Sequence, residues 1–154
     1  MFDLELVGRP EGEGERLFMW GRIILGTFQD EFQAPLFDWA PGDYAAQWLD
    51  AAERLVAGAP SVVFLTHMSH PTASYHLGWP AWRDGDQVLV QERLFLTEQL
   101  GGPFDLERPE THLGPRQEIS DEGLKISQWS VSVDDVAAFV ERKRRSTLAA
   151  RGSP

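Results

Sequence analysis

The stretch SVVFLTHMSHPTASYHLGWPAWRDGDQVLVQERLFL (residues 61–96) indicates the fold class more clearly than any other part of the sequence. Residues 61–67 are a short apolar run, and residues 74–82 alternate between apolar and polar side chains, as strands do. An Asp-Gly pair at 84–85 then gives a strong hairpin signal before residues 87–96, which return as a strand. The pattern predicts a three-stranded antiparallel meander.

A helix is predicted upstream of the meander, between Pro41 and Gly58. Proline suits the first helical position, where a missing N–H costs nothing, and glycine is a natural helix stop. The apolar stripe of this helix has helical spacing and comprises Tyr44, Trp48, Ala51, Ala52, Leu55 and Val56. Its aromatic side chains are predicted to anchor the core.

A second helix is predicted after Ser132. Ser132 and Asp135 have the spacing of a capping box in its acidic form, and an apolar stripe follows at 136–140. The basic run ERKRR at 141–145 is interpreted as cations at the C-terminal end of the helix, where the dipole favours positive charge.

Upstream of the first helix, residues 17–25 predict a strand because aromatic and β-branched side chains are enriched there. The strand is expected to continue toward Phe28 with a bend at Gly26. Residues 32–39 are expected to be irregular, with Pro35 confining any ladder to a sheet edge.

Three segments are expected to lack regular structure. Residues 1–16 and 146–154 are expected to be flexible, because the first is rich in glycine and charge and the second is a chain end. Residues 100–119 are rich in glycine and proline and predict a long loop. A loop of this length suggests a functional or partner-facing segment.

Residues 121–133, DEGLKISQWSVSV, predict a strand at 124–131 with a change of phase. Leu124 and Ile126 are apolar on even numbers, whereas the apolar residues from Trp129 onward fall on odd numbers. A slip of one residue sends every side chain to the opposite face. The strand therefore either contains a β-bulge near 127–128 or is covered on both faces, and the bulge is preferred.

The order strand, helix, meander, long loop, strand, helix predicts an α+β fold class. We expect an antiparallel β-sheet, as one sheet or as two packed sheets, with two main α-helices. A chain of 154 residues without an internal repeat fits a single domain, residues 1–154.

The formal net charge of −10 is unevenly distributed. Residues 131–154 carry five basic and three acidic side chains, a balance of +2, so residues 1–130 hold −12. Such an acidic body disfavours nucleic acid and favours a basic partner, although acidity for solubility alone is the alternative. No apolar run approaches the ~20 residues of a membrane helix, so the chain is expected to be cytoplasmic, without a membrane partner.

The sequence contains no recognisable catalytic motif. It has no cysteine, no Gly-x-Ser-x-Gly and no P-loop. Carboxylate pairs at Asp84/Asp86 and Asp121/Glu122 could serve acid–base chemistry, but both pairs lie in predicted turns, where such residues are expected for backbone reasons. We expect no enzymatic activity and no cofactor.

His67, His70 and His76 provide the alternative hypothesis, a small metal-dependent enzyme, because imidazoles are common zinc ligands. The first two straddle a strand end and a turn, and strand periodicity places His76 on the more polar face. Ordinary hairpin histidines are therefore preferred, and no metal site is expected.

Residues 32–55, 87–96 and 121–139 together resemble the immunity proteins of bacterial contact-dependent growth inhibition systems, the CdiI type. The resemblance rests on joint order and spacing across roughly residues 28–140. The matching residues are Pro35-Leu36, Trp39, Asp43-Tyr44, Trp48, Val88, Val90-Gln91, Phe95-Leu96, Gly123, Lys125-Ile126-Ser127 and Trp129.

The resemblance implies a non-enzymatic function. Similar proteins bind and block the C-terminal toxin domain of a partner protein, often a basic nuclease. The resemblance also implies a structural motif made of Trp39, Tyr44, Trp48, Lys125 and Trp129. Within it, Trp129 would pack in the core and Lys125 would face solvent or the partner.

An acidic toxin-binding face is the hypothesis that joins this resemblance to the charge. The candidate residues are Asp84, Asp86, Glu92, Glu98, Glu118, Asp121 and Glu122. If they share one face, they form a negative patch that mimics phosphate and meets a basic protein surface. The alternative is a set of scattered solubilising charges.

Overall fold

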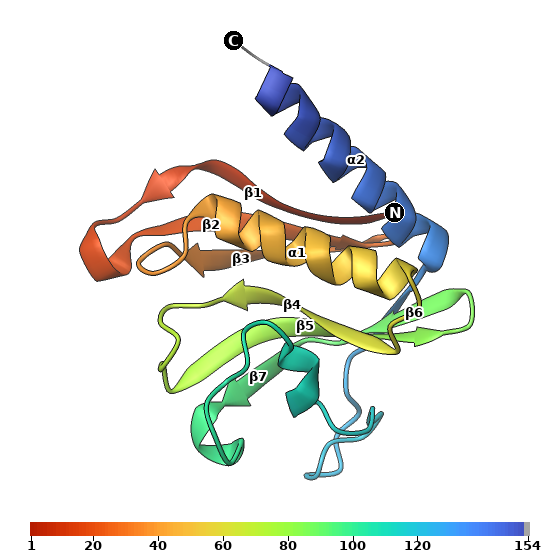
Figure 1. Cartoon of the computed structure of the whole chain (residues 1–154). Helices are drawn as coiled ribbons and strands as arrows, with labels where there is room; N and C mark the ends of the chain where they lie inside the picture. Colours follow the sequence, from red (N-terminus) through yellow and green to blue (C-terminus); the bar gives the residue numbers. More distant parts are fainter. Residues whose placement is uncertain (153–154) are drawn as a thin grey trace.

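The computed structural model describes the backbone of residues 1–152 and the side chains of residues 1–148. Within these residues the chain forms two α-helices and two antiparallel sheets, one of three strands and one of five. The predicted α+β fold class is confirmed. Figure 1 shows the three-stranded sheet above the five-stranded sheet, with α1 running along the front.

The helices are α1 (Pro41–Val56) and α2 (Val133–Gly152). The strands are β1 (Phe2–Glu11), β2 (Phe18–Leu25), β3 (Phe28–Pro35), β4 (Ser61–His67), β5 (Tyr75–Asp84), β6 (Gln87–Val90), β7 (Arg93–Leu96) and β8 (Trp129–Ser132). Short 3-10 turns are η1 (Gly14–Arg16), η2 (Thr97–Gln99) and η3 (Pro109–His112).

The three-stranded sheet has the order β1-β2-β3, and β2 turns into β3 through two residues, Gly26 and Thr27. The prediction of a single strand bending at Gly26 is therefore wrong. Gly26 has a φ of 67°, the left-handed conformation that a two-residue hairpin turn requires and that glycine adopts without strain. Pro35 ends β3, which is an edge strand, as its missing N–H demands.

β1 contradicts the expectation that residues 1–16 are flexible. Phe2 and Leu4 are buried against the core, and β1 pairs with β2 from Phe2 to Val7 and again at Glu11. The glycines and charges that suggested a flexible segment lie mainly in the distal part of β1 and in η1, where the side chains are exposed.

The five-stranded sheet has the order β4-β5-β6-β8, and β7 pairs with the other half of β5. The predicted meander is confirmed, except that its third strand is interrupted. β6 pairs with residues 81–84 and β7 with residues 75–78, and Gln91-Glu92 separates them. The Gln91 N–H still donates to the Pro80 carbonyl at 3.0 Å, so the break leaves this backbone donor satisfied.

The phase change in residues 121–133 has a cause that neither sequence interpretation anticipated. Only Trp129–Ser132 forms a strand, and the preceding residues form a separate turn closed by a bridge between Ile119 and Lys125. The β-bulge prediction is wrong. Leu124 is 66% exposed, so its alternation with Ile126 does not reflect a buried strand face.

Two apolar clusters flank the five-stranded sheet. The larger lies between the two sheets and the helices, and its largest buried side chains include Phe2, Tyr44, Phe64, Trp79 and Phe139. The smaller lies on the opposite face, under the loop that follows β7, and comprises Val63, Leu65, Phe95, Phe104 and Leu113. The five-stranded sheet is therefore covered on both faces.

α1 has the predicted bounds and buried stripe, and its polar atoms bind the neighbouring strands. The Trp48 indole Nε1 donates to the Leu65 carbonyl at 2.7 Å, and the Tyr44 hydroxyl donates to the Pro35 carbonyl at 2.7 Å. These bonds allow both aromatic residues to be buried without leaving a donor unpaired.

α2 begins with the predicted capping box. The Asp135 N–H donates to Ser132 Oγ at 3.0 Å, and the Ser132 N–H donates to Asp135 Oδ2 at 3.2 Å. The helix continues to residue 152, so most of the segment 146–154 is helical, and residues 153–154 lie outside the described residues.

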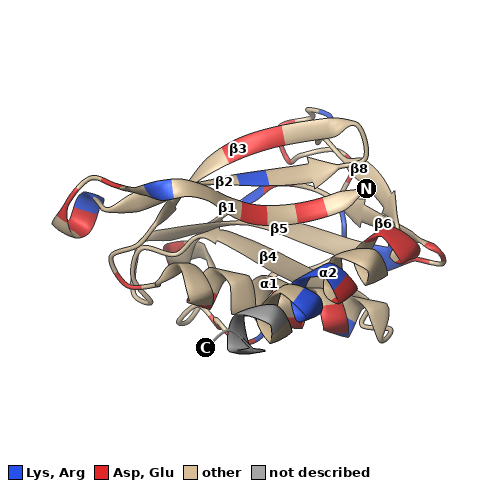
Figure 2. Cartoon of the chain, turned by 90° about the horizontal axis from the view of Figure 1, so that it is seen from above, with Lys and Arg blue, Asp and Glu red and all other residues tan. Residues whose placement is uncertain are grey.

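The basic run 141–145 consequently lies in the middle of α2, and its interpretation as a C-terminal dipole partner is wrong. Arg142 donates to the Phe2 carbonyl at 2.7 Å, and Lys143 Nζ lies 3.4 Å from Asp3 Oδ1. Arg144 Nε lies 3.4 Å from Glu53 Oε1 of α1. Figure 2 shows this stretch running beside α1, so these cations join α2 to β1 and α1.

Across the described part of the chain, neither helix combines the length and the apolar character that a membrane crossing requires.

Candidate functional site

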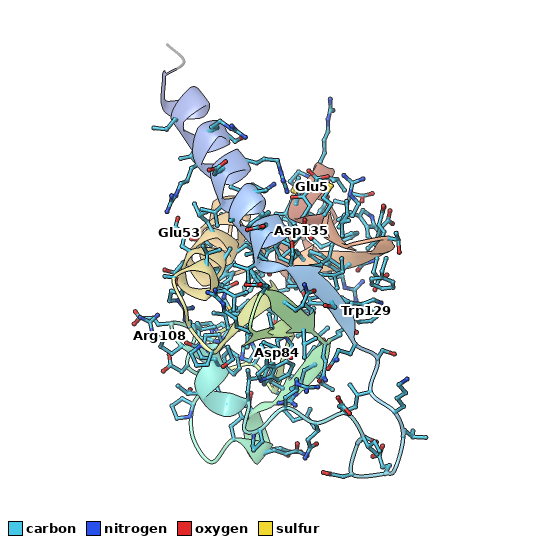
Figure 3. All side chains as sticks on the ribbon, turned by 90° about the vertical axis from the view of Figure 1, so that its right-hand side faces the viewer. Glu5, Glu53, Asp84, Arg108, Trp129 and Asp135 are labelled. Atoms are coloured by element: carbon cyan, nitrogen blue, oxygen red, sulfur yellow. The ribbon has the colours of Figure 1, made fainter. Side chains whose placement is uncertain are left out.

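Residues 118–126, called here the projecting hairpin, stand away from the packed body at the lower right of Figure 3. Three backbone bonds close this segment: Ser120 N–H to Leu124 O at 2.7 Å, Gly123 N–H to Ser120 O at 2.9 Å, and Ile126 N–H to Glu118 O at 2.9 Å. Gly123 has a φ of 84°, which favours glycine at the turn. The projecting hairpin is therefore internally ordered.

A buried glutamine ties the base of the projecting hairpin to the five-stranded sheet. Gln91 is 2% exposed, and its Nε2 donates to the Gln117 carbonyl at 2.8 Å and to Gln128 Oε1 at 3.0 Å. Arg116 donates to the same Gln128 oxygen at 2.8 Å and to Glu118 Oε1 at 3.3 Å. The residues before and after the projecting hairpin are thus held together at one point.

The tip of the projecting hairpin exposes large apolar side chains beside carboxylates. Ile119 is 61% and Leu124 66% exposed, and Glu118, Asp121 and Glu122 are exposed around them. A hollow of about 840 Å³ lies against the projecting hairpin, lined by Glu118, Ile119, Gly123, Lys125, Ile126, Ser127, Gln128 and Trp129. The sequence does not point to Ile119 or Leu124 as contact residues, since Leu124 falls in the predicted strand 124–131 and Ile119 in the predicted loop 100–119.

The seven acidic candidates do not gather on one face. Glu118, Asp121 and Glu122 lie together on the projecting hairpin, whereas Asp84 and Asp86 lie at the β5–β6 turn. Glu98 lies in η2, beside the other end of β5. β5 is ten residues long, and at about 3.3 Å per residue its two ends are about 30 Å apart.

Glu92 belongs to a different acidic pair. It lies between β6 and β7, and the partial loss of water around its carboxyl, followed by the charge of Asp30, raises the pKa of that carboxyl above the usual range. Asp30 lies on β3, so the pair spans the two sheets. Sequence reasoning missed Asp30, because only the fold brings β3 near residue 92.

The residues of the implied structural motif occupy different environments. Tyr44 and Trp48 are buried, and Trp39 is half-buried with its ring 5.0 Å from that of Tyr44. Trp129 is half-buried and packs on the larger cluster, whereas Lys125 is exposed and lines the hollow beside the projecting hairpin.

The histidines do not converge. His70 is exposed, and its Nδ1 accepts a bond from the Thr72 N–H at 3.1 Å. His76 is fully buried against the Phe104 ring, at 4.3 Å between centroids, so the prediction of a polar face is wrong. His67 lies 3.4 Å from the Tyr75 hydroxyl. Among the described residues no group of three potential ligands is arranged to hold a metal ion.

Burial lowers the pKa of His76 below the ordinary range, and the charges of His67 and His112 act in the same direction. Neither ring nitrogen of His76 has a hydrogen-bond partner among the described residues. The neutral ring therefore behaves as an apolar core side chain between β5 and the loop over it.

Comparisons with known proteins identify the family. The model of the CdiI N-terminal domain matches residues 34–139. A chain of the solved "CdiA-CT/CdiI toxin and immunity complex from Enterobacter cloacae" has the same fold, with a TM-score of 0.85 and 22% identity over 94% of this chain and 99% of that chain. No curated protein matches the sequence. Because the family model spans most of the chain and the fold agrees with it, the protein belongs to the CdiI N-terminal domain family.

Proposed function

We propose that the protein is an immunity protein that binds and neutralises the C-terminal toxin domain of a cognate contact-dependent growth inhibition effector in the bacterial cytoplasm. The observation that carries this proposal is the family match over residues 34–139. The shared fold with a chain of a toxin and immunity complex supports it, since that chain covers nearly the same length.

We further propose that the cognate toxin domain is a basic protein, with a nuclease as the first candidate. The net charge of −10, with −12 on residues 1–130, favours encounter with a positively charged partner. The projecting hairpin contributes exposed carboxylates to this charge, and it lies below the five-stranded sheet in Figure 1, whereas the basic stretch of α2 lies above it. A nuclease fits because its active surface must attract phosphate.

The test uses the C-terminal domain of the effector that the neighbouring gene encodes. Expression of that domain in a bacterial host should arrest growth, and co-expression of this protein should restore growth. The purified pair should form a complex of fixed stoichiometry. Growth arrest that persists at equal expression, together with no complex in solution, would contradict the proposed function.

Nuclease activity is measured separately. The purified toxin domain should degrade RNA or DNA, and an equimolar amount of this protein should block degradation. A toxin domain that arrests growth and is neutralised, but degrades neither, would contradict the nuclease assignment alone.

A further inference from the structure

We propose that the projecting hairpin, residues 118–126, is the principal toxin-binding element, with Ile119 and Leu124 as apolar anchors inside a rim of carboxylates. The inference rests on the proposed function, because it names the surface through which a toxin domain would be bound. The observation behind it is the combination of exposed apolar side chains and a fixed backbone in one projecting segment.

The projecting hairpin exposes two large apolar side chains to solvent. Ile119 and Leu124 leave most of their surface in water although the chain has a large core available. Ile119 pairs with Lys125 and Ser120 with Leu124, so the side chains of Ile119 and Leu124 leave opposite faces of the projecting hairpin, and each face carries one exposed apolar anchor. Apolar groups that project from a rim of polar residues are typical of protein-binding sites.

The backbone of the projecting hairpin is held by hydrogen bonds before any partner binds. A loop that is already held in its bound shape loses little conformational entropy on binding. The Ser120–Leu124 and Ile126–Glu118 bonds fix the turn, and Gln91 fixes its base to the sheet. The projecting hairpin therefore presents Ile119 and Leu124 in a preformed arrangement. Neither side chain contributes to the core of the protein.

The charge around the two apolar side chains favours a basic partner over a second copy of this chain. Glu118, Asp121 and Glu122 surround the anchors, and Lys125 is the cation among them. A second copy of this chain docking through the same surface would bring these carboxylates against each other, since a twofold interface pairs identical patches. A partner with an apolar recess and basic rim fits instead, which is the surface expected of the basic toxin domain.

The experiment measures binding to the purified toxin domain of the neighbouring effector gene. The double variant Ile119→Ala/Leu124→Ala keeps the charge unchanged and removes only the apolar anchors. We expect its affinity to fall at least ~30-fold, which corresponds to ~2 kcal/mol. Leu148→Ala is the matched control, because Leu148 is 67% exposed on α2, and its affinity should stay within ~3-fold of wild type, as at energetically neutral sites.

Hydrogen exchange of the unmodified protein gives a second readout that does not depend on the variants folding. Toxin binding should slow exchange of the amides within residues 118–128 more than those of α2. Unchanged exchange there, or a double variant that is folded and binds within ~3-fold of wild type, would overturn the inference while leaving the proposed function intact.

Two further outcomes are informative. If wild-type protein neither binds nor neutralises the toxin domain, both the proposed function and this inference fail. If wild-type protein is a dimer by light scattering and the double alanine variant is a monomer, the projecting hairpin is a self-association surface and the toxin assignment is overturned.

Discussion

Phe28 and Trp129 stack with their ring centroids 4.2 Å apart and an interplanar angle of 23°. Phe28 begins β3 in the three-stranded sheet, and Trp129 begins β8 in the five-stranded sheet. The Trp129 ring also lies 5.7 Å from that of Trp79. One half-buried tryptophan therefore joins the two sheets at the point where the chain leaves the projecting hairpin.

The variant Trp129→Ala is expected to destabilise the fold by about 2 kcal/mol, less than the ~3–5 kcal/mol typical of a fully buried aromatic residue, because Trp129 is only half-buried. Urea denaturation measures the loss. Phe37→Ala is the control, because Phe37 is 52% exposed, and it should change stability by no more than ~0.5 kcal/mol. Equal effects of the two variants would show that the Phe28–Trp129 stack does not hold the sheets together.

The variant Gln91→Ala is expected to loosen the projecting hairpin without unfolding the body. It removes both bonds from Nε2, to Gln117 O and Gln128 Oε1, at a cost of about 1–3 kcal/mol. Hydrogen exchange should become faster at the amides of residues 118–128 and stay unchanged in α1. The exposed Gln33→Ala serves as control, and faster exchange throughout the chain would contradict a local anchoring role.

Elements whose signals are local could be predicted from the sequence. The sequence predicts α1 because the apolar stripe and both helix ends lie within one segment. It predicts the meander because the alternating strand residues lie directly next to the Asp-Gly turn. The capping box of α2 is equally local. These features depend on spacing that a helix or hairpin imposes regardless of the rest of the fold.

Features that depend on distant partners were missed. β1 looked flexible because its burial depends on α2 and β2, and the basic run looked like a helix end because its partners Asp3 and Glu53 are remote in sequence. The end of the projecting hairpin, from Leu124 on, is predicted as the start of a strand because Leu124 and Ile126 alternate, although Leu124 is 66% exposed. Periodicity predicts local geometry and leaves open whether a face meets a partner.

Stability is expected to decrease between pH 7.5 and pH 5.5 because of His76. Its pKa is lower in the folded state than in the unfolded chain, where it is about 6.5. The unfolded chain therefore binds the proton more readily, so the contribution of His76 is fully present above the unfolded pKa and is lost as the pH falls below it. His67, whose pKa burial also lowers, acts in the same direction.

The urea midpoint at the two pH values measures this effect, and His76→Leu is the discriminating variant. The variant should lose part of the pH dependence, because it keeps an apolar side chain against Phe104 and removes the proton site. The raised pKa of Glu92 has the opposite effect on the pH dependence of stability, and this effect is the same in wild type and in His76→Leu. A pH dependence that is the same in wild type and variant would show that His76 does not titrate on unfolding.

Charge reversal on the projecting hairpin is expected to slow association with the toxin domain. Asp121→Lys/Glu122→Lys should reduce the association rate at least ~10-fold at low salt, because electrostatic steering raises on-rates by ~10–10³. Raising the salt from ~0.01 M to ~0.15 M should narrow the difference, since the Debye length falls from ~30 Å to ~8 Å. Stopped-flow mixing measures both rates.

Glu11→Lys/Glu13→Lys is the matched control for this variant. It makes the same change in net charge at exposed positions around the end of β1, at the opposite side of the molecule in Figure 1. If the projecting hairpin meets the toxin, its reversal slows association much more than the control does. Equal slowing by both pairs would assign steering to the overall charge of the protein. Association that responds neither to the reversals nor to salt would refute a role for the carboxylates.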